Sequence, residues 1–387
     1  MHTIVVGGGF AGVKAALELA KQQAGRVTLI SERPYFLHHG LLYAAAVGLD
    51  REQTAISLDD IFASYPEVTV VEATMTSLDP DRQLVVCGHQ SYRYDALILA
   101  LGSQIDLSSL SPQEKTHIYD SRSLEHIERL RTHIHTAIVA NQPVDRPYVI
   151  VGGGTTGVEL AGILATYIRD MSEHTLSTRT KLRVIIAEQQ QRLLPDSSKE
   201  ASRAVTVRLS SLGVECVTGV RIDTLGSEYV TVGSHKVATD TIIWATGVIN
   251  NPFYAAHPQY FTVVSNGLVA VNPYLEAYRD IYVIGDNVDV KGAGHTRSAL
   301  DMAVYVADHL LRRETGRLYG AYRPASRILS VPVGNDWAYV ECLGIYIKGR
   351  LGRLVHDHLA YRSYLEIMPR TMADIAVKPH TTKKSYL

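Results

Sequence analysis

The sequence lacks several features that mark particular classes of protein. Its three cysteines, Cys87, Cys216 and Cys342, form no Cys-x-x-Cys pair, so they indicate neither a dithiol redox motif nor a metal site. No apolar run reaches the ~18 residues of a membrane-spanning helix. The net charge of -1 gives no general attraction to nucleic acid. We therefore expect no metal, no nucleic-acid partner and no spanning segment.

The scarcity of cysteine and the early start of the first strand bear on where the protein works. Few cysteines suit a reducing compartment, and a strand that begins by Thr3 leaves no room for a signal peptide. We expect a cytoplasmic protein that is soluble or held on a membrane surface. Its 387 residues, 46% hydrophobic and 20% charged, predict two or three ordinary globular domains.

Residues 3–32 have the order strand, GxGxxG loop, helix, strand and acid that is typical of a dinucleotide-binding module. Gly7 permits a tight turn, Gly9 lets the backbone approach a pyrophosphate, and Gly12 lets the helix pack closely on the strand. The phosphates would lie at the helix N-terminus, where free N–H groups point outward. Glu32 would accept hydrogen bonds from ribose hydroxyls. The alternative is a glycine-rich turn without a ligand.

The same order recurs at residues 148–188, with Gly152, Gly154 and Gly157 in the loop and Glu188 at the end of the second strand. A polar stretch between helix and strand makes the spacing from glycine to acid longer than in the first module. Two such modules in one chain suggest one bound flavin and one exchangeable reductant. We therefore predict FAD in the first module and a nicotinamide cofactor in the second.

The choice between NADH and NADPH depends on Glu188. A carboxylate at this position would repel the 2′-phosphate of NADPH and therefore favours NADH. Arg183 and Arg192 lie near it in the sequence and keep NADPH open as the less favoured alternative.

Three further apolar strands end in glycine turns, at residues 94–103, 241–247 and 280–286. Their ends are predicted to bring loops close to a cofactor, although each could be an ordinary strand exit. Asp286 could bind a ribityl hydroxyl, and it could also cap the helix predicted over residues 296–313.

Together these patterns predict an α/β fold with two Rossmann-like dinucleotide-binding domains. The FAD domain is split into residues 1–110 and 265–325, with a nicotinamide domain inserted at 111–264. Residues 326–387 form a C-terminal element, in which 349–365 are predicted to be a basic, partly amphipathic helix. That helix could lie on an anionic membrane, or it could pack on the FAD domain or on a second subunit.

Several segments make the chain resemble the type II NADH dehydrogenases, which are single-chain FAD enzymes that pass electrons from NADH to a membrane quinone. The resemblance covers nearly the whole chain and is most specific at residues 33–43, 153–162 and 188–195.

The chain departs from that family at two places. His39-Gly40 stands where the family has Gln-Pro, and Arg297, Asp301 and Met302 replace glutamines that help to form the quinone pocket. At both places the chain is similar to the apoptosis-inducing-factor-like oxidoreductases, including the ferroptosis-suppressor branch.

The resemblance implies hydride transfer from nicotinamide C4 to flavin N5, and then transfer of electrons to a quinone without proton pumping. It further implies a homodimer at the inner face of the cell membrane. Glu159 would lie near the nicotinamide and the flavin, where it could orient the nicotinamide or relay a proton; the alternative is a helix-dipole partner in the first turn. The residues predicted to bind the cofactors are Gly7, Gly9, Phe10, Ala11, Gly12, Glu32, Arg33, His39, Ala100, Gly102, Gly152, Gly154, Thr155, Thr156, Gly157, Glu188, Thr246, Gly247, Gly285 and Asp286.

Other interpretations stay open. His38 and His39 could donate a proton or bind the flavin, although a polar lining without chemistry is favoured. Arg297 and Asp301 are predicted to pair on a helix surface. Competing functions are a soluble NAD(P)H-dependent reductase of a small electron-carrier protein and a low-turnover redox sensor that binds FAD and NADH. A sulfide:quinone oxidoreductase would need paired cysteines near the flavin, and the three cysteines do not supply them.

Overall fold

The computed structural model describes residues 1–38, 42–43, 45–47, 51–108, 110–139, 146–174, 183–225, 228–317 and 319–376. His39, predicted to bind the flavin, lies outside these residues. So does the polar tail at 378–387, which the sequence predicts to be disordered.

A six-stranded sheet forms the centre of the first module. Its middle strand β1 is parallel to the strands on both sides, and β20 at one edge is antiparallel. Burial on both faces selects continuous apolar strands rather than alternating ones. In order across the sheet the strands are β20 (Glu276–Tyr278), β21 (Ile281–Val283), β9 (Ala96–Leu99), β1 (His2–Val6), β2 (Arg26–Ser31) and β5 (Val68–Glu72).

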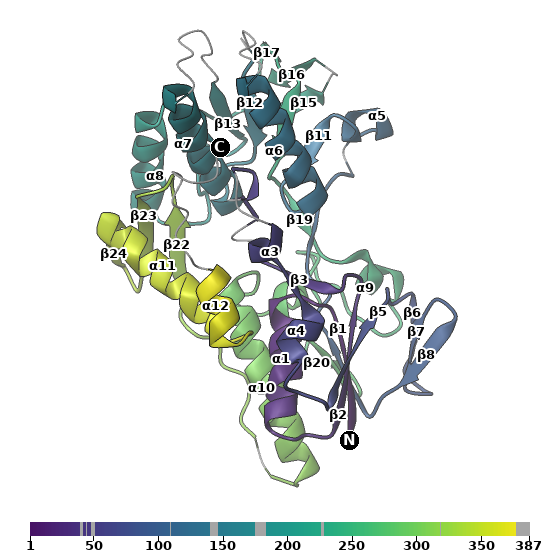
Figure 1. Ribbon diagram of the computed structural model, residues 1–387. Helices are drawn as coiled ribbons and strands as arrows, with labels where there is room; N and C mark the ends of the chain where they lie inside the picture. Colours follow the sequence, from purple (N-terminus) through teal and green to yellow (C-terminus); the bar gives the residue numbers. More distant parts are fainter. Residues whose placement is uncertain are drawn as a thin grey trace.

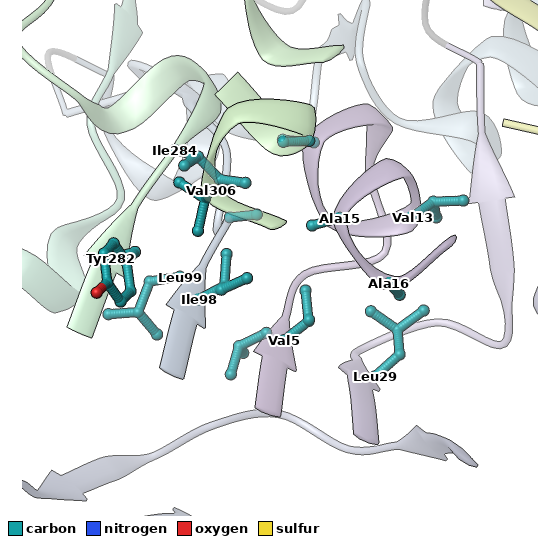
Figure 2. Packing of buried hydrophobic residues seen from close by; sticks show 14 of the residues in the cluster. Val5, Val13, Ala15, Ala16, Leu29, Ile98, Leu99, Tyr282, Ile284 and Val306 are labelled. Carbon is teal, nitrogen blue, oxygen red and sulfur yellow. The ribbon is translucent and has the colours of Figure 1, made fainter. Parts of the chain in front are cut away.

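Two helices, α1 (Phe10–Lys21) and α10 (Thr296–Glu314), lie side by side against this sheet (Figure 1). Figure 2 shows how they pack, with Ala16 of α1 beside Leu29 and with Val306 of α10 above Ile98. Segments nearly 300 residues apart in the sequence therefore share one core.

A second, five-stranded parallel sheet forms the centre of the other module. Its strands in order are β11 (Ile118–Asp120), β18 (Thr241–Trp244), β12 (Tyr148–Val151), β13 (Val184–Glu188) and β14 (Glu215–Thr218). The helices that pack on it are α6 (Leu124–Val139), α7 (Thr155–His174) and α8 (Lys199–Ser211). The two sheets, one parallel throughout and one parallel except at the edge strand β20, confirm the predicted α/β fold with two Rossmann-like units.

Smaller elements complete the modules. The short strands are β3 (Tyr35–Leu37), β4 (Ala55–Ser57), β6 (Ser77–Asp79), β7 (Leu84–Cys87), β8 (Gln90–Arg93), β10 (Gln104–Ile105), β15 (Ile222–Leu225), β16 (Tyr229–Val232), β17 (His235–Ala238) and β19 (Val248–Ile249). The short helices are α3 (Arg51–Thr54), α4 (Leu58–Phe62), α5 (Pro112–Lys115), α9 (Pro252–Ala256) and the 3-10 helix η1 (Gly285–Asn287). Strands β10 and β19 pair antiparallel and so fasten together the two connections between the modules.

The C-terminal element contains a three-stranded antiparallel sheet that the sequence analysis did not predict. Its strands are β22 (Ile328–Pro332), β23 (Ala338–Cys342) and β24 (Ile345–Gly349). The predicted helix forms as α11 (Arg350–Leu365) and is followed by α12 (Arg370–Ala376). Helix α11 packs closely on the sheet, because Gly352 has no side chain where a Cβ would lie 2.2 Å from the carbonyl oxygen of Ala338.

Candidate cofactor and redox site

The first glycine loop is built for close backbone contacts at two positions and for open space at a third. A Cβ at Gly12 would lie 1.9 Å from the Gly7 oxygen, and a Cβ at Gly7 would lie 2.1 Å from the Ala100 oxygen. Gly7 also has a φ of +118°, which favours glycine. By contrast, a Cβ at Gly9 would meet no atom within 4 Å. Gly9 therefore leaves a free surface at the start of α1, where a phosphate could approach the backbone.

The second loop repeats this arrangement. A Cβ at Gly157 would lie 1.9 Å from the Gly152 oxygen, and a Cβ at Gly152 would lie 2.8 Å from the Ala245 oxygen. Gly154 again faces open space within 4 Å. The two loops fit the phosphates of two dinucleotides for the same physical reason.

A cavity of about 640 Å³ lies at the carboxyl ends of the first sheet, within the ~300–1,000 Å³ range of cofactor pockets. Part of its wall comes from the second module, through Asp120, Arg122 and Ser123. The predicted FAD-binding residues that line it are Gly7, Gly9, Glu32, Arg33, Ala100, Gly102 and Asp286. This cavity meets the requirement for an elongated cofactor that starts at the first glycine loop and ends between the modules.

Asp286 belongs to a hydrogen-bond network at the inner wall of this cavity. Ser103 Oγ donates to Asp286 Oδ2 at 2.8 Å, and Arg122 Nη1 donates to Ser103 Oγ at 2.6 Å. Asp286 lies in η1, whereas α10 begins at Thr296 with His295 as its N-cap, so the helix-capping interpretation of Asp286 is wrong. The network leaves Asp286 in the cavity wall, where it can accept a hydrogen bond from a ligand.

Glu188 ends β13 and is almost fully buried, with 7% of its surface exposed. Its carboxylate accepts hydrogen bonds from the backbone N–H groups of Gly153 and Gln190, both at 2.7 Å. The Arg192 guanidinium donates to four backbone carbonyls beyond Glu188, and Arg183 precedes β13 at its opposite end. Both arginines are therefore poorly placed to attract a 2′-phosphate at the end of β13.

Glu159 is the fifth residue of α7, which begins at Thr155, so the expectation that it lies in the first turn is wrong. Helix-dipole effects fall off within the first turn, which weakens that interpretation. Glu159 makes no hydrogen bond or ion pair with any described residue. Burial raises the pKa of its carboxyl to about 8, while Arg353 acts to lower it. A carboxyl with such a pKa can take up and release a proton near neutral pH.

Tyr43 brings the segment at residues 42–47 into contact with the second module. Its hydroxyl donates a hydrogen bond to Thr156 Oγ1 at 3.1 Å. Burial, and next the charge of Glu159, raise the pKa of Tyr43 to about 12, so the phenol is protonated at neutral pH. Tyr43, Thr156 and Glu159 thus form a polar cluster at the start of α7.

Arg297 and Asp301 form the helix-surface ion pair that the sequence predicts, at 2.8 Å. Arg297 also pairs with Glu366 at 2.9 Å, and the buried Lys14 of α1 lies 3.5 Å from the same carboxylate. Met302 is fully buried, and its sulfur accepts from the Gly285 N–H at 3.4 Å. These residues join α10, α1 and the end of α11 instead of opening a polar pocket.

The other predicted residues lie around the two loops. His38 is buried and stacks on Tyr364 with a centroid distance of 4.4 Å, with Phe10 edge-on at 5.0 Å, and its role stays a prediction. Ala11 and Gly285 face each other below the cavity, where a Cβ at Gly285 would lie 3.3 Å from that of Ala11. Thr155 begins α7, and Thr246 and Gly247 follow β18 beside Gly152.

Sequence reasoning missed Arg122, Tyr43 and Arg353, although each contacts or acts on a predicted site residue. Each of them comes from an element remote in sequence from the residue it serves. Tyr43 ends the segment 33–43 that carries part of the family resemblance, but its contact with Thr156, like the contacts of Arg122 and Arg353, is identified only by the tertiary arrangement.

The cysteines are free and lie on three separate strands, β7, β14 and β23, and they do not line the cavity. Within the described residues, no helix combines the length and the apolar character needed to cross a bilayer.

Comparison with known proteins agrees with this geometry. The chain is 28% identical to type II NADH:quinone oxidoreductase Ndh of Mycobacterium tuberculosis, over 79% of this chain and 71% of the relative. It is also 28% identical to ferroptosis suppressor protein 1 of Taeniopygia guttata, over 91% of each. The structure of NDH2 from Plasmodium falciparum with NADH has the same fold, with a TM-score of 0.84, 15% identity and 97% of both chains covered. These relatives confirm the resemblance inferred from the sequence.

A family model described as pyridine nucleotide-disulphide oxidoreductase matches residues 1–303. This range holds both glycine loops, the shared cavity and the strand ends that line it. Because the match covers well over half of the 387 residues, the chain belongs to the pyridine nucleotide-disulphide oxidoreductase family and is an oxidoreductase.

Proposed function

We propose that this chain is an FAD-dependent NADH:quinone oxidoreductase that acts at the inner face of the cell membrane without proton pumping. The observation that carries the proposal is the pair of glycine loops that are open at Gly9 and Gly154, one in each module, together with a cavity that starts at the first loop and takes part of its wall from the second module. FAD and NADH are the cofactors, and bound FAD supplies the hydride acceptor. The protein brings the two reactants together, which is the main contribution a scaffold makes to such a transfer.

Several residues of the two modules have a physical role in this proposal. Glu32 and Asp286 accept hydrogen bonds from the sugar-derived hydroxyls of FAD, and Gly9 makes room for its pyrophosphate. Arg122 fixes the position of Ser103 and Asp286 in the cavity wall. Gly154 and the start of α7 receive the phosphates of NADH.

Glu159 acts as the proton carrier on the acceptor side, because its carboxyl has a pKa of about 8 and has no fixed partner among the described residues. Tyr43 holds Thr156 in place beside it. A quinone takes up protons with its electrons, so a nearby carboxyl that exchanges protons near neutral pH assists its reduction.

NADH is preferred over NADPH because the end of β13 presents the buried carboxylate of Glu188. Arg192 is engaged with backbone carbonyls and Arg183 lies at the other end of the strand. A 2′-phosphate would therefore meet a negative charge without a compensating cation from either arginine.

The membrane contact is assigned to the outer surface of the C-terminal element. Leu343, Ile345, Leu351 and Leu354 are 66 to 81% exposed there, next to the basic side chain of Arg350. Apolar side chains flanked by basic ones suit an anionic bilayer surface. A homodimer stays a prediction, and its interface could use part of the same surface.

The test has two steps. Stopped-flow mixing with NADH should bleach the flavin absorbance, and steady-state NADH oxidation with a water-soluble quinone should turn over and should increase when lipid is added. Fast flavin reduction without quinone turnover would replace this proposal with a reductase of an electron-carrier protein. No bleaching with either NADH or NADPH would leave only a redox-sensing role.

A further inference from the structure

One face of α7 packs directly on the turn between β22 and β23. Glu159, Gly162 and Thr166 are three and four residues apart, so they lie on the same side of the helix. A Cβ at Gly162 would lie 2.7 Å from the backbone nitrogen of Gly334. A Cβ at Gly334 would in turn lie 2.7 Å from Thr166 Oγ1. The helix face that carries Glu159 therefore meets the C-terminal element at Gly334.

Arg353 of α11 reaches the same turn. Its Nη1 donates to the carbonyl oxygen of Gly334 at 3.0 Å, and its Nε donates to Asp357 Oδ1 at 2.7 Å. Because the guanidinium donates to acceptors on two elements, its direction is fixed. The cation is thus held against the turn that contacts α7, one helical turn along from Glu159.

The charge of this guanidinium reaches the Glu159 carboxyl. Burial raises the pKa of Glu159 to about 8, and Arg353 acts in the opposite direction. Both groups are partly shielded from solvent, and charges in such places are screened less than fully exposed ones.

The other polar groups near this contact come from several elements. Arg208 of α8 donates to the Val333 carbonyl oxygen of the same turn at 3.4 Å and pairs with Asp336. Tyr43, on the side of residues 42–47, is a protonated phenol at neutral pH. Asp357 partly neutralises Arg353. His356 accompanies them on α11; burial, and next Arg353, lower its pKa to about 4, so it is uncharged at neutral pH, and its Nδ1 lies 2.8 Å from Ser330 Oγ.

We propose that Arg353 is a positioning residue for Glu159: α11 holds a fixed cation beside α7 that favours the ionised carboxylate. The C-terminal element is then part of the redox site as well as a surface contact. This inference rests on the proposed role of Glu159 as the proton carrier.

Arg353 and Asp357 carry opposite charges on α11, so removing each charge should shift the apparent pKa of flavin reoxidation in opposite directions. The FAD-loaded protein is reduced with NADH and mixed rapidly with menadione over a range of pH centred on about 8. Replacing Arg353→Met should raise the apparent pKa of flavin reoxidation by about half a unit or more, because the ionised carboxylate loses its cation. Replacing Asp357→Asn should lower that apparent pKa, because Arg353 loses its counterion.

Two controls separate electrostatics from loss of structure. Arg353→Lys keeps the charge and should keep the apparent pKa near that of the parent. Arg350→Met removes an exposed cation from the same helix and should have no effect. If the ion pair has only a structural role, Arg353→Met and Asp357→Asn should shift the apparent pKa of flavin reoxidation in the same direction, because both lose the same ion pair. That result would overturn the inference. If Arg353→Met does not retain FAD, the shift of the apparent pKa in Asp357→Asn decides the question alone: a lower apparent pKa supports the inference, and an unchanged or higher one overturns it.

The variant Glu159→Gln distinguishes a failure of the role inferred for Arg353 from a failure of the proton-carrying role proposed for Glu159. If the glutamine variant loses the pH dependence while Arg353→Met and Asp357→Asn leave the parent's profile unchanged, only the role of Arg353 is wrong. If Glu159→Gln keeps the parent's profile, the proton-carrying role of Glu159 fails, and the inference fails with it.

Discussion

Glu159 is a partly buried acid that the folded protein keeps protonated to a higher pH than the unfolded chain does. Burial raises the pKa of its carboxyl to about 8, whereas the pKa of a free glutamate side chain is about 4.3. Below the unfolded pKa the carboxyl is protonated in both states. As the pH rises from there towards the folded pKa, the unfolded chain releases a proton that the folded chain keeps, so stability is lost. Such a cost is typical of a functional site.

Replacing Glu159→Gln should therefore stabilise the protein in a pH-dependent way. We expect the Tm of the variant to exceed that of the parent by about 2 °C or more at pH 8 and to approach it near pH 5. Thermal unfolding followed across this window measures the difference. A difference in Tm that is the same at every pH would mean that the carboxyl does not carry the raised pKa.

Glu188 is the residue on which the choice of nicotinamide cofactor depends. Glu188→Gln keeps an oxygen that can accept from the Gly153 N–H but removes the negative charge. The ratio of kcat/KM for NADH to that for NADPH should fall by about tenfold, equivalent to ~1.4 kcal/mol. Steady-state kinetics with both nucleotides give this ratio. A parent protein that already prefers NADPH would contradict the assignment of Glu188.

In the second glycine loop, one glycine is needed for packing of the helix, whereas another, three residues away, leaves space for a ligand. A methyl group at Gly154 meets open space, whereas one at Gly157 would lie 1.9 Å from the Gly152 oxygen. Gly154→Ala should fold with a Tm within about 2 °C of the parent and retain FAD, but its KM for NADH should rise by about tenfold or more. Gly157→Ala should instead lower the Tm by several degrees, because the helix must move away from the strand.

These two variants need FAD content, Tm and NADH kinetics measured side by side. The matching substitution in the first loop, Gly9→Ala, should affect the other cofactor: the protein should fold but should not retain FAD. If Gly154→Ala binds NADH as the parent does, the open space beside it is not the phosphate site.

The parts of the fold that the sequence could predict are those formed by contiguous residues. Strand β1, the loop with Gly9 and helix α1 are contiguous in the chain, so periodicity and glycine spacing suffice to locate them. The cation Arg353 reaches α7 through a turn at Gly334, and Tyr43 reaches it from the first module; such pairings across sequence follow only from packing. The short β22–β24 sheet was missed because its strands carry no spacing motif. The predicted domain boundaries stay a prediction.

At the scale of the whole molecule, the C-terminal element contacts both modules. Glu366, just after α11, pairs with Lys14 of α1 and with Arg297 of α10, while Arg353 contacts the turn that packs on α7. Arg297, one of the residues that stand where the type II family has glutamines, is thus part of the attachment of this element. The same element also carries the exposed side chains of Leu351 and Leu354.

The membrane role of that surface can be separated from its structural role. Leu351 and Leu354 are 69% and 66% exposed, so replacing both with Ser removes apolar area without opening the core. We expect co-sedimentation with anionic liposomes to fall by about tenfold or more, while flavin reduction by NADH stays unchanged. Val207→Ser provides a matched control, because Val207 is 64% exposed on α8 of the other module. Unchanged liposome binding together with a shift from dimer to monomer in sedimentation would assign the leucines to a subunit interface instead.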